Sequence, residues 1–186
     1  MNPLILQLDN AGQTIGWISW KDAVTYYAKD TVSWTMGENV FRFHGGHQRN
    51  TGKQSYIDVH SIIATRGMMN TRRFDLAPPL TNRALFCRDQ QMCMYCLTTL
   101  PHRHLTRDHV VPVGHGGTNI WTNVVTACVR CNQRKACRTP QQAGMTLHAV
   151  PYTPNYAEWL VLRNRRILTD QMAFLKTQFS RRNLAL

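Results

Sequence analysis

The sequence predicts an α+β protein in which a small N-terminal α+β lobe precedes a cysteine-rich module and a long C-terminal helix. Three observations predict this organisation. Short apolar segments near the N-terminus are separated by turn residues, two Cys-x-x-Cys pairs stand 31 residues apart, and an amphipathic stretch lies near the C-terminus. A length of 186 residues allows one core, or one domain with a smaller appendage. We expect an N-terminal lobe at 1–68, a linker and lead-in helix at 69–92, the cysteine-rich module at 93–138 and a helical extension at 139–186.

The N-terminal lobe is predicted to contain strands and one helix. Apolar runs at residues 4–8 and 14–19 flank a turn rich in Asp, Asn and Gly. Ser19 followed by Asp22 is typical of a helix start, and this helix is expected to reach Lys29. Further strands are expected at 32–36 and 40–44, joined as a hairpin through 37–39, and at 55–64.

Helices are predicted on both sides of the cysteine-rich module. Asn82 is a candidate cap for a short helix over residues 83–90. Residues 155–179 carry apolar side chains at helical spacing, with several arginines on the rest of the surface. This long helix either packs on a core with a solvated basic face or contacts the backbone of a nucleic acid.

Basic residues dominate the charged side chains. The chain has 22 Lys and Arg against 10 Asp and Glu, which gives a net charge of +12 and a pI of about 10. Such a charge attracts polyanions, and arginine, which outnumbers lysine here, suits phosphate groups. The start of the chain does not read as a signal peptide, and no apolar run is long enough to span a membrane. We therefore expect a nucleic-acid partner, a cytoplasmic location and no membrane association.

The cysteines predict a metal site. Two Cys-x-x-Cys pairs are present, Cys93 with Cys96 and Cys128 with Cys131. In a chain without an export signal, such pairs favour zinc over disulfide bonds. Four thiolates complete a tetrahedron around Zn²⁺ and leave no open position, so this zinc is expected to be structural. Four buried thiols or a redox pair are the alternatives, and Cys87 and Cys137 have no expected role.

Residues suited to phosphodiester hydrolysis lie between the cysteine pairs and directly after them. This reaction needs a base and positive charge near the phosphate oxygens. His109 can act as a base near neutral pH, Asp108 offers a carboxylate to a cation, and Asn132 offers an amide oxygen. Neighbouring residues of a strand point to opposite faces. Asp108 and His109 can therefore share one phosphate only if the strand end is distorted or the phosphate lies between them.

This segment resembles the HNH endonuclease family, in the branch with cysteine knuckles that includes McrA-like restriction nucleases. The matching residues are Asp108-His109, Gly116-Gly117, Asn123, Cys128, Cys131, Asn132 and Lys135. The resemblance implies a ββα-metal module with His109 as general base, and with Asp108 and Asn132 as ligands of one catalytic cation. It gives Asn123 the role of orienting the loop that presents His109.

Several assignments within this resemblance remain open. Asn119 competes with Asn123 for the orienting role. Asn132 stands where the family often has His, and a site without that added imidazole favours Mg²⁺ or Mn²⁺ as the catalytic ion. Three further histidines are either loop residues or accessory ligands and donors: His102, His104 and His115.

The sequence predicts an endonuclease that cuts double-stranded DNA. Basic residues around the site are expected to bind nucleic-acid phosphates, and Lys135 is the strongest candidate among Arg107, Arg130, Arg134, Lys135 and Arg138. A ribonuclease with the same site, and a non-catalytic zinc module that binds nucleic acid, are the alternatives. A bacterial or phage origin and a homodimer are compatible with the sequence.

Overall fold

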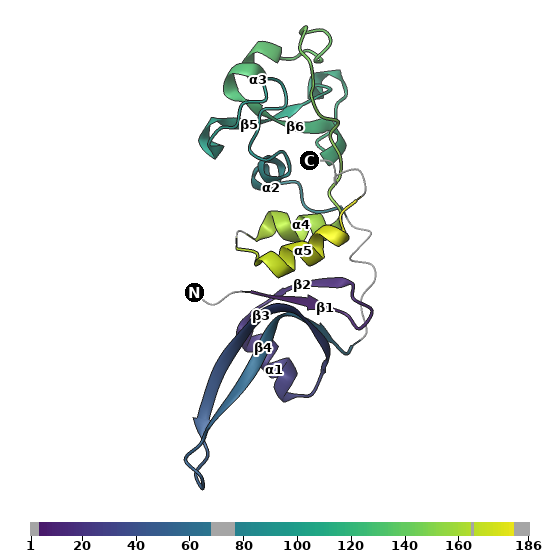
Figure 1. The fold of residues 1–186 in the computed structure, drawn as a ribbon. Coiled ribbons are helices and arrows are strands. Elements are labelled where there is room, and N and C mark those ends of the chain that lie inside the picture. The colour runs from purple at the N-terminus through teal and green to yellow at the C-terminus, as the bar shows by residue number, and fades with distance from the viewer. Residues whose placement is uncertain (1–3, 68–76, 165, 181–186) are drawn as a thin grey trace. The chain divides into compact units, whose positions relative to one another are not determined.

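The chain folds into two compact units in the computed structural model, which describes residues 4–67, 77–164 and 166–180 (Figure 1). One unit is Leu76–Asn155, and the other combines Met1–Asp75 with Tyr156–Leu186. The fold is α+β, as predicted. The units divide the chain differently from the expected segments, because the C-terminal helices bury their apolar side chains against the N-terminal sheet.

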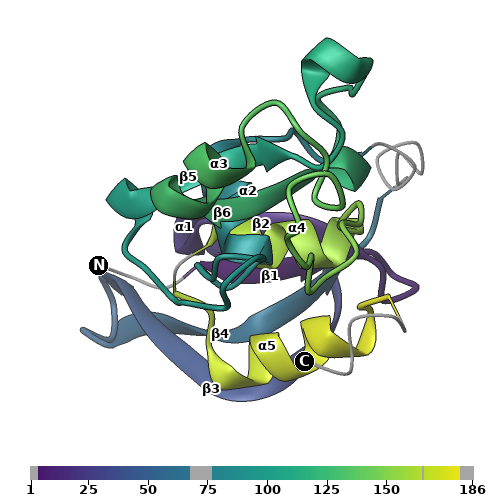
Figure 2. The same cartoon turned by 90° about the horizontal axis from the view of Figure 1, so that it is seen from above.

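A four-stranded sheet forms the base of the first unit (Figures 1 and 2). Its strands are β1 (Ile5–Leu8), β2 (Thr14–Ile18), β3 (Val32–His47) and β4 (Gln54–Thr65), in the order β2-β1-β4-β3. β1 and β4 are parallel, and the other neighbours are antiparallel. Helix α1 (Trp20–Ala28) begins at the predicted capping box, in which Ser19 and Asp22 each accept a backbone N–H of the other.

The long helix predicted over residues 155–179 is wrong, because the chain forms two shorter helices there. They are α4 (Tyr156–Arg163) and α5 (Thr169–Thr177). After α4, the side chain of Asn164 accepts the backbone N–H of Arg166, a local bond that competes with helical pairing. No helix among the described residues is long and apolar enough to cross a membrane.

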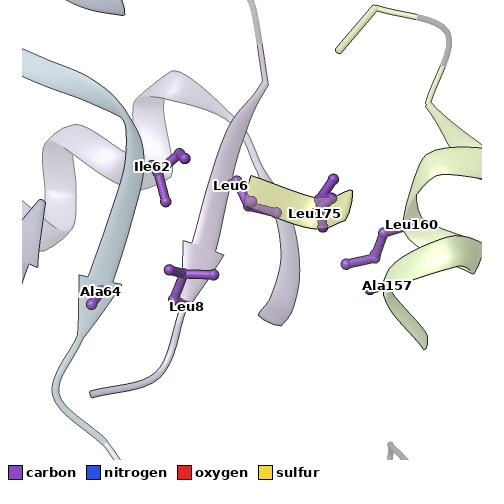
Figure 3. Close-up of a cluster of buried hydrophobic side chains, with 7 residues drawn as sticks. All are labelled: Leu6, Leu8, Ile62, Ala64, Ala157, Leu160 and Leu175. Atoms are coloured by element: carbon purple, nitrogen blue, oxygen red, sulfur yellow. The ribbon is translucent and has the colours of Figure 1, made fainter. Parts of the chain in front are cut away.

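The core of the first unit joins the sheet to both C-terminal helices. Figure 3 shows buried side chains of β1 and β4 grouped with those of α4 and α5: Leu6, Leu8, Ile62, Ala64, Ala157, Leu160 and Leu175. Gln171 of α5 is also buried, and its amide donates to the carbonyl oxygens of Leu4 (2.9 Å) and Ser61 (2.8 Å). These contacts explain why the N-terminal sheet and helices α4 and α5 form one unit.

The hairpin predicted at residues 37–39 is also wrong, since β3 continues through them and pairs with β4 on both sides. The register shifts between Met36 and Val40, so residues 37–39 form a bulge rather than a turn. Asp170 holds this bulge by accepting the backbone N–H of Asn39 (3.1 Å) and the hydroxyl of Ser61 (2.6 Å). Polar residues therefore mark an internal bulge here, and the chain reverses only after His47.

The second unit is built around a two-stranded antiparallel sheet. Its elements are α2 (Asn82–Arg88), β5 (Leu105–His109), β6 (Val124–Cys128) and α3 (Val129–Lys135). Asp108 pairs with Val125 and His109 with Val124 in the β5-β6 register. Figure 1 shows α3 on one side of the two strands and α2 on the other.

A buried ion pair fixes α2 to β6. The predicted short helix forms, but Thr81 rather than Asn82 caps it, by accepting the N–H of Ala84. Arg88 contacts Asp89 at 2.7 Å, with both side chains buried. Arg88 also donates to the carbonyl of Val124, and Asp89 accepts the N–H of Thr126 (2.7 Å). This network pairs the buried charges of Arg88 and Asp89 with each other and with backbone groups of β6.

The β3 bulge predicts a strong effect of one glycine. Gly37 has a φ of +99°, and a Cβ there would lie against Ser61 Oγ and 2.6 Å from Asp170 Oδ2. We expect Gly37→Ala to lower the free energy of unfolding of the first unit by about 1–3 kcal/mol. Urea denaturation measures this change. Gly46→Ala, where a Cβ meets nothing within 4 Å, serves as the control. Equal stabilities of the two variants would contradict the conclusion that the β3 bulge requires a glycine at position 37.

Candidate active site

The four predicted metal-binding cysteines form one cluster. The sulfur atoms of Cys93, Cys96, Cys128 and Cys131 all lie within 4.8 Å of one another. Tetrahedral zinc with Zn–S bonds of about 2.3 Å would place them roughly 3.8 Å apart, so the spacing suits one metal ion such as zinc. Cys87 and Cys137 are exposed and lie outside the cluster.

Backbone hydrogen bonds shape both cysteine pairs into tight turns. The N–H of Leu97 donates to the carbonyl of Cys93 (2.8 Å), and the N–H of Cys131 donates to Cys128 Sγ (3.3 Å). A side-chain hydrogen bond with Thr98 lowers the pKa of Cys96 to about 6, whereas burial raises the pKa of Cys93. Metal binding would displace any proton on the four cysteine sulfurs, because cysteine binds a metal ion as the thiolate.

The carboxylate of Asp108 is buried and faces α3. Its Oδ1 atom is 3.0 Å from Lys135 Nζ, and its Oδ2 atom accepts the hydroxyl of Tyr95 at 2.6 Å. Lys135 also donates to the carbonyl of His109 (2.7 Å) and is 1% exposed. The expectation that Lys135 binds a nucleic-acid phosphate is therefore corrected: the ammonium group balances the buried charge of Asp108.

Burial also affects the phenol beside Asp108. It raises the pKa of Tyr95, and the hydrogen bond to the Asp108 carboxylate raises it further. The phenol therefore remains a neutral donor at physiological pH. Sequence reasoning missed Tyr95, because its place between two cysteines gives no sign of contact with a residue 13 positions later.

His109 lies on the opposite face of β5 from Asp108, as strand alternation requires. Its Nε2 atom is 3.2 Å from Oδ1 of Asn119, and Arg107 donates to the same oxygen at 2.8 Å. Because an amide oxygen only accepts, Nε2 carries the hydrogen in this contact, and Nδ1 of the neutral ring keeps the lone pair. The side chain that contacts the imidazole is thus Asn119, the alternative considered from the sequence.

Arg107 is held in place on the same face as His109. It is half-buried, its Nη2 atom lies 3.4 Å from the carbonyl oxygen of Leu80, and burial lowers its pKa. The two-residue spacing of Arg107 and His109 in a strand was the signal that they share a face. The contacts of Arg107 lie within the protein, and the structure gives it a supporting position beside Asn119.

Asn123 closes the loop that follows His109. Its side chain accepts the N–H of Val111 (2.9 Å) and donates to the carbonyls of Val111 (3.0 Å) and Thr118 (2.9 Å). These bonds fasten both ends of the segment that contains Gly116 and Gly117. Gly117 has no room for a side chain, because a Cβ there would overlap the carbonyl of Val111. Asn123 therefore fixes the loop, while Asn119 contacts the ring.

Asn132 lies on α3, on the same side of β5 as Asp108. Its Nδ2 atom donates to the hydroxyl of Thr106 (2.9 Å), two residues before Asp108 in the strand. Lys135 stands one helical turn later and reaches Asp108. Helix α3 thus aligns Asn132 with the beginning of β5 and Lys135 with its end. The structure brings Asp108 and Asn132 to one face and His109 to the other.

The donor set can accept a divalent cation. Each carboxylate oxygen of Asp108 accepts one hydrogen bond and keeps a further lone pair. The side-chain oxygen Oδ1 of Asn132 has no hydrogen-bond partner in the part of the chain that the structure describes. Oxygen atoms of this kind suit Mg²⁺ or Mn²⁺. The amino group of Lys135 already neutralises the charge of Asp108. A cation bound by Asp108 would therefore lie close to the positive charge of Lys135.

The surface of the second unit is basic. Its sequence contains eight basic residues and two acidic ones, Asp89 and Asp108, and both acids are buried in ion pairs. Arg130, Arg134 and Arg138, which are predicted to bind phosphates, are exposed, and Arg138 also donates to the carbonyl of Arg134. A groove of about 700 Å³ beside the cysteine cluster is lined in part by Arg130, Arg134 and His104. The remaining predicted histidines, His102 and His115, are exposed.

Comparison with known proteins identifies part of the second unit. Residues 93–148 match the family model described as HNH endonuclease. A stretch of 90 residues is 34% identical to the CRISPR-associated endonuclease Cas9 of Actinomyces naeslundii. The match covers 48% of this chain but only 6% of that protein. The chain therefore spans a small fraction of the length of this relative.

The cysteine cluster predicts a selective effect of metal removal. We expect one zinc ion per chain, and we expect a strong chelator to unfold the second unit. A closed four-thiolate site contributes about 10–16 kcal/mol to folding, against about 5–15 kcal/mol for the stability of a typical domain. Elemental analysis measures the zinc, and hydrogen exchange should show lost protection in β5 and β6 but not in β1 and β4.

Two cysteine variants make this test specific. Cys131→Ser should lose the zinc, whereas Cys137→Ser, outside the cluster, should retain it. Full protection of β5 and β6 in zinc-free protein would contradict the structural role of the metal.

Proposed function

We propose that this protein is a metal-dependent endonuclease that hydrolyses phosphodiester bonds in double-stranded DNA, because residues 93–148 match the HNH endonuclease family model. The observation that carries the proposal is the end of β5. Consecutive side chains there direct a carboxylate toward α3 and an imidazole toward Asn119. A cation-binding oxygen next to an oriented base is the combination that phosphodiester hydrolysis needs. The scissile phosphate lies across this strand end, between the two faces.

Asp108 and Asn132 are the residues that would hold the catalytic cation, Mg²⁺ or Mn²⁺. When bound, such a cation offsets the negative charge that develops on the phosphate oxygens. Lys135 adds a fixed positive charge on the same side, 3.0 Å from Asp108. The protein therefore supplies both the ligand atoms and a background charge that limits repulsion between the carboxylate and the phosphate.

His109 acts as the general base. Asn119 accepts the hydrogen on Nε2, so the lone pair of Nδ1 is free to take a proton from the attacking water. Arg107 keeps the amide oxygen of Asn119 directed at the ring, and Asn123 holds the loop that carries Asn119. The orientation of the base thus depends on the β5-β6 loop rather than on the metal-binding face.

The charge distribution supports a nucleic acid as substrate. In the second unit the acids are buried in ion pairs, so its exposed charged groups are arginines. Exposed arginines bind phosphates through paired N–H donors and give salt-dependent affinity. The zinc site at the cysteine cluster serves to position α3 and takes no part in the chemistry.

One observation favours a non-catalytic alternative. Both oxygens of Asp108 already accept hydrogen bonds, from Tyr95 and Lys135. If these bonds prevent cation binding, the same module binds nucleic acid through its arginines without cutting it. An assay that measures both binding and cleavage of DNA distinguishes the two functions.

Cleavage of supercoiled plasmid is the direct test. We expect nicked or linear product in Mg²⁺ or Mn²⁺, and none with EDTA. Because removal of a general base costs about 10²–10⁴-fold, His109→Ala should reduce the rate by that factor. His115→Ala, an exposed histidine of the same loop, is the matched control and should cut normally. Folded, zinc-loaded protein that binds DNA without cutting it would support the alternative.

Asn119 provides a second test of the mechanism. We expect Asn119→Ala to lower the cleavage rate by about 100-fold, because a misdirected base reacts slowly. Asn119→Asp keeps an oxygen facing Nε2 and should retain most of the activity. Gel assays of plasmid nicking measure both rates. Equal losses in the two variants would show that the acceptor oxygen of residue 119 does not orient His109.

A further inference from the structure

The β3-β4 hairpin extends well past the sheet to which it belongs. β1 pairs with β4 only from Leu6↔Ile62 to Leu8↔Ala64, whereas β3 pairs with β4 as far as His47↔Gln54. We call residues 40–60 the distal ribbon. Figure 1 shows this ribbon extending away from the rest of the first unit as two strands and a turn.

One face of the distal ribbon is attached to α1. Phe41, Phe43 and Val59 pack in the cluster that includes Ala23 of α1. The ring of Phe43 stacks on Trp20, with centroids 4.6 Å apart and planes 7° apart. This packing gives the base of the ribbon a fixed direction.

The opposite face is polar and ordered by a charged pair. Arg42 donates to both oxygens of Asp58, at 2.8 and 2.7 Å, and its guanidinium lies 4.2 Å from the ring centre of Tyr56. Tyr56 is 59% exposed. These cross-strand contacts hold the two strands in register.

The end of the ribbon is basic and highly polar. Residues 45–54 are all exposed and contain no acidic or large apolar side chain. Arg49 and Lys53 carry the charge, and Asn50 adds an exposed amide. A partner that matches this surface must be anionic and rich in hydrogen-bonding groups, which describes a nucleic acid and not an apolar protein face.

We propose that the distal ribbon inserts into the major groove of double-stranded DNA. The major groove of B-form DNA is wide enough for a two-stranded ribbon, and its base edges offer acceptors and donors to arginine and asparagine side chains. Arg49 and Lys53 bind backbone phosphates at the edge of the groove, and Asn50 lies between them in the turn. The inference rests on the proposed function for its substrate, and it adds a DNA-binding element outside the cutting site.

The test measures duplex binding by full-length protein that cannot cut. Chains carrying His109→Ala are titrated against a labelled DNA duplex by fluorescence anisotropy at several salt concentrations. Adding Arg49→Ala and Lys53→Ala should weaken binding by roughly 10- to 100-fold and reduce the salt slope by about 2, because two phosphate contacts are lost. Zinc content and circular dichroism confirm that each variant is folded.

A matched double variant separates a specific contact from overall charge. Lys29→Ala with Lys176→Ala removes the same charge from two exposed positions of the first unit, the C-cap of α1 and the last turn of α5, and should change the affinity little. Equal weakening by the two double variants would overturn the proposal. An equal loss on duplex RNA, whose deep and narrow major groove excludes a ribbon, would also overturn it.

The outcome is distinguishable from that of the proposed function. If plasmid is cut but the Arg49 and Lys53 substitutions leave duplex binding unchanged, the ribbon proposal alone fails. If plasmid stays intact while these substitutions weaken duplex binding as expected, the ribbon proposal holds and the endonuclease proposal fails.

Discussion

The four-cysteine cluster is the constraint on which the geometry of the second unit depends. Cys128 ends β6 and also caps α3, because its sulfur accepts the N–H of Cys131. The other pair precedes β5 and is joined to β6 where the N–H of Met94 donates to the carbonyl of Thr126 (2.9 Å). A metal bound by all four sulfurs would close these segments into one short frame. Such a frame would set the direction of α3 independently of the side chains of the candidate site.

From this frame, α3 determines the two faces of β5. Asn132 and Lys135 lie one turn apart on the same face of α3, and Thr106 and Asp108 lie two residues apart on the same face of β5. Asn132 therefore contacts Thr106 while Lys135 contacts Asp108. A buried carboxylate such as Asp108 is unfavourable unless paired, and Lys135 satisfies it. Strand alternation then leaves His109 on the other side, where the loop provides Asn119. The carboxylate of Asp108 and the imidazole of His109 therefore lie on opposite faces of β5, although the two residues are adjacent in the chain.

Charge is distributed differently in the two units. In the second unit the acids are buried in ion pairs, so the exposed charges repel one another unless a polyanion is bound. In the first unit acidic and basic side chains are mixed, and acids take structural roles such as the bond of Asp170 to the β3 bulge. Burial opposes ionisation of Asp170, but hydrogen bonds from Ser61 and Asn39 outweigh it and lower the pKa. The distal ribbon is the exception in this unit, since its turn carries only basic charge.

The sequence by itself determined the features that depend on local spacing. The cysteine pairs, the capping box at Ser19 and the adjacency of Asp108 and His109 could all be predicted, because short-range geometry fixes each of them. Only the tertiary structure decided which partner each polar group meets. Lys135 is buried against Asp108, and residues 37–39 form a bulge held by Asp170, because side chains distant in sequence satisfy these groups. The sequence shows which polar groups will need a hydrogen-bond partner when they are buried. The packing of the folded chain decides which distant residue provides that partner.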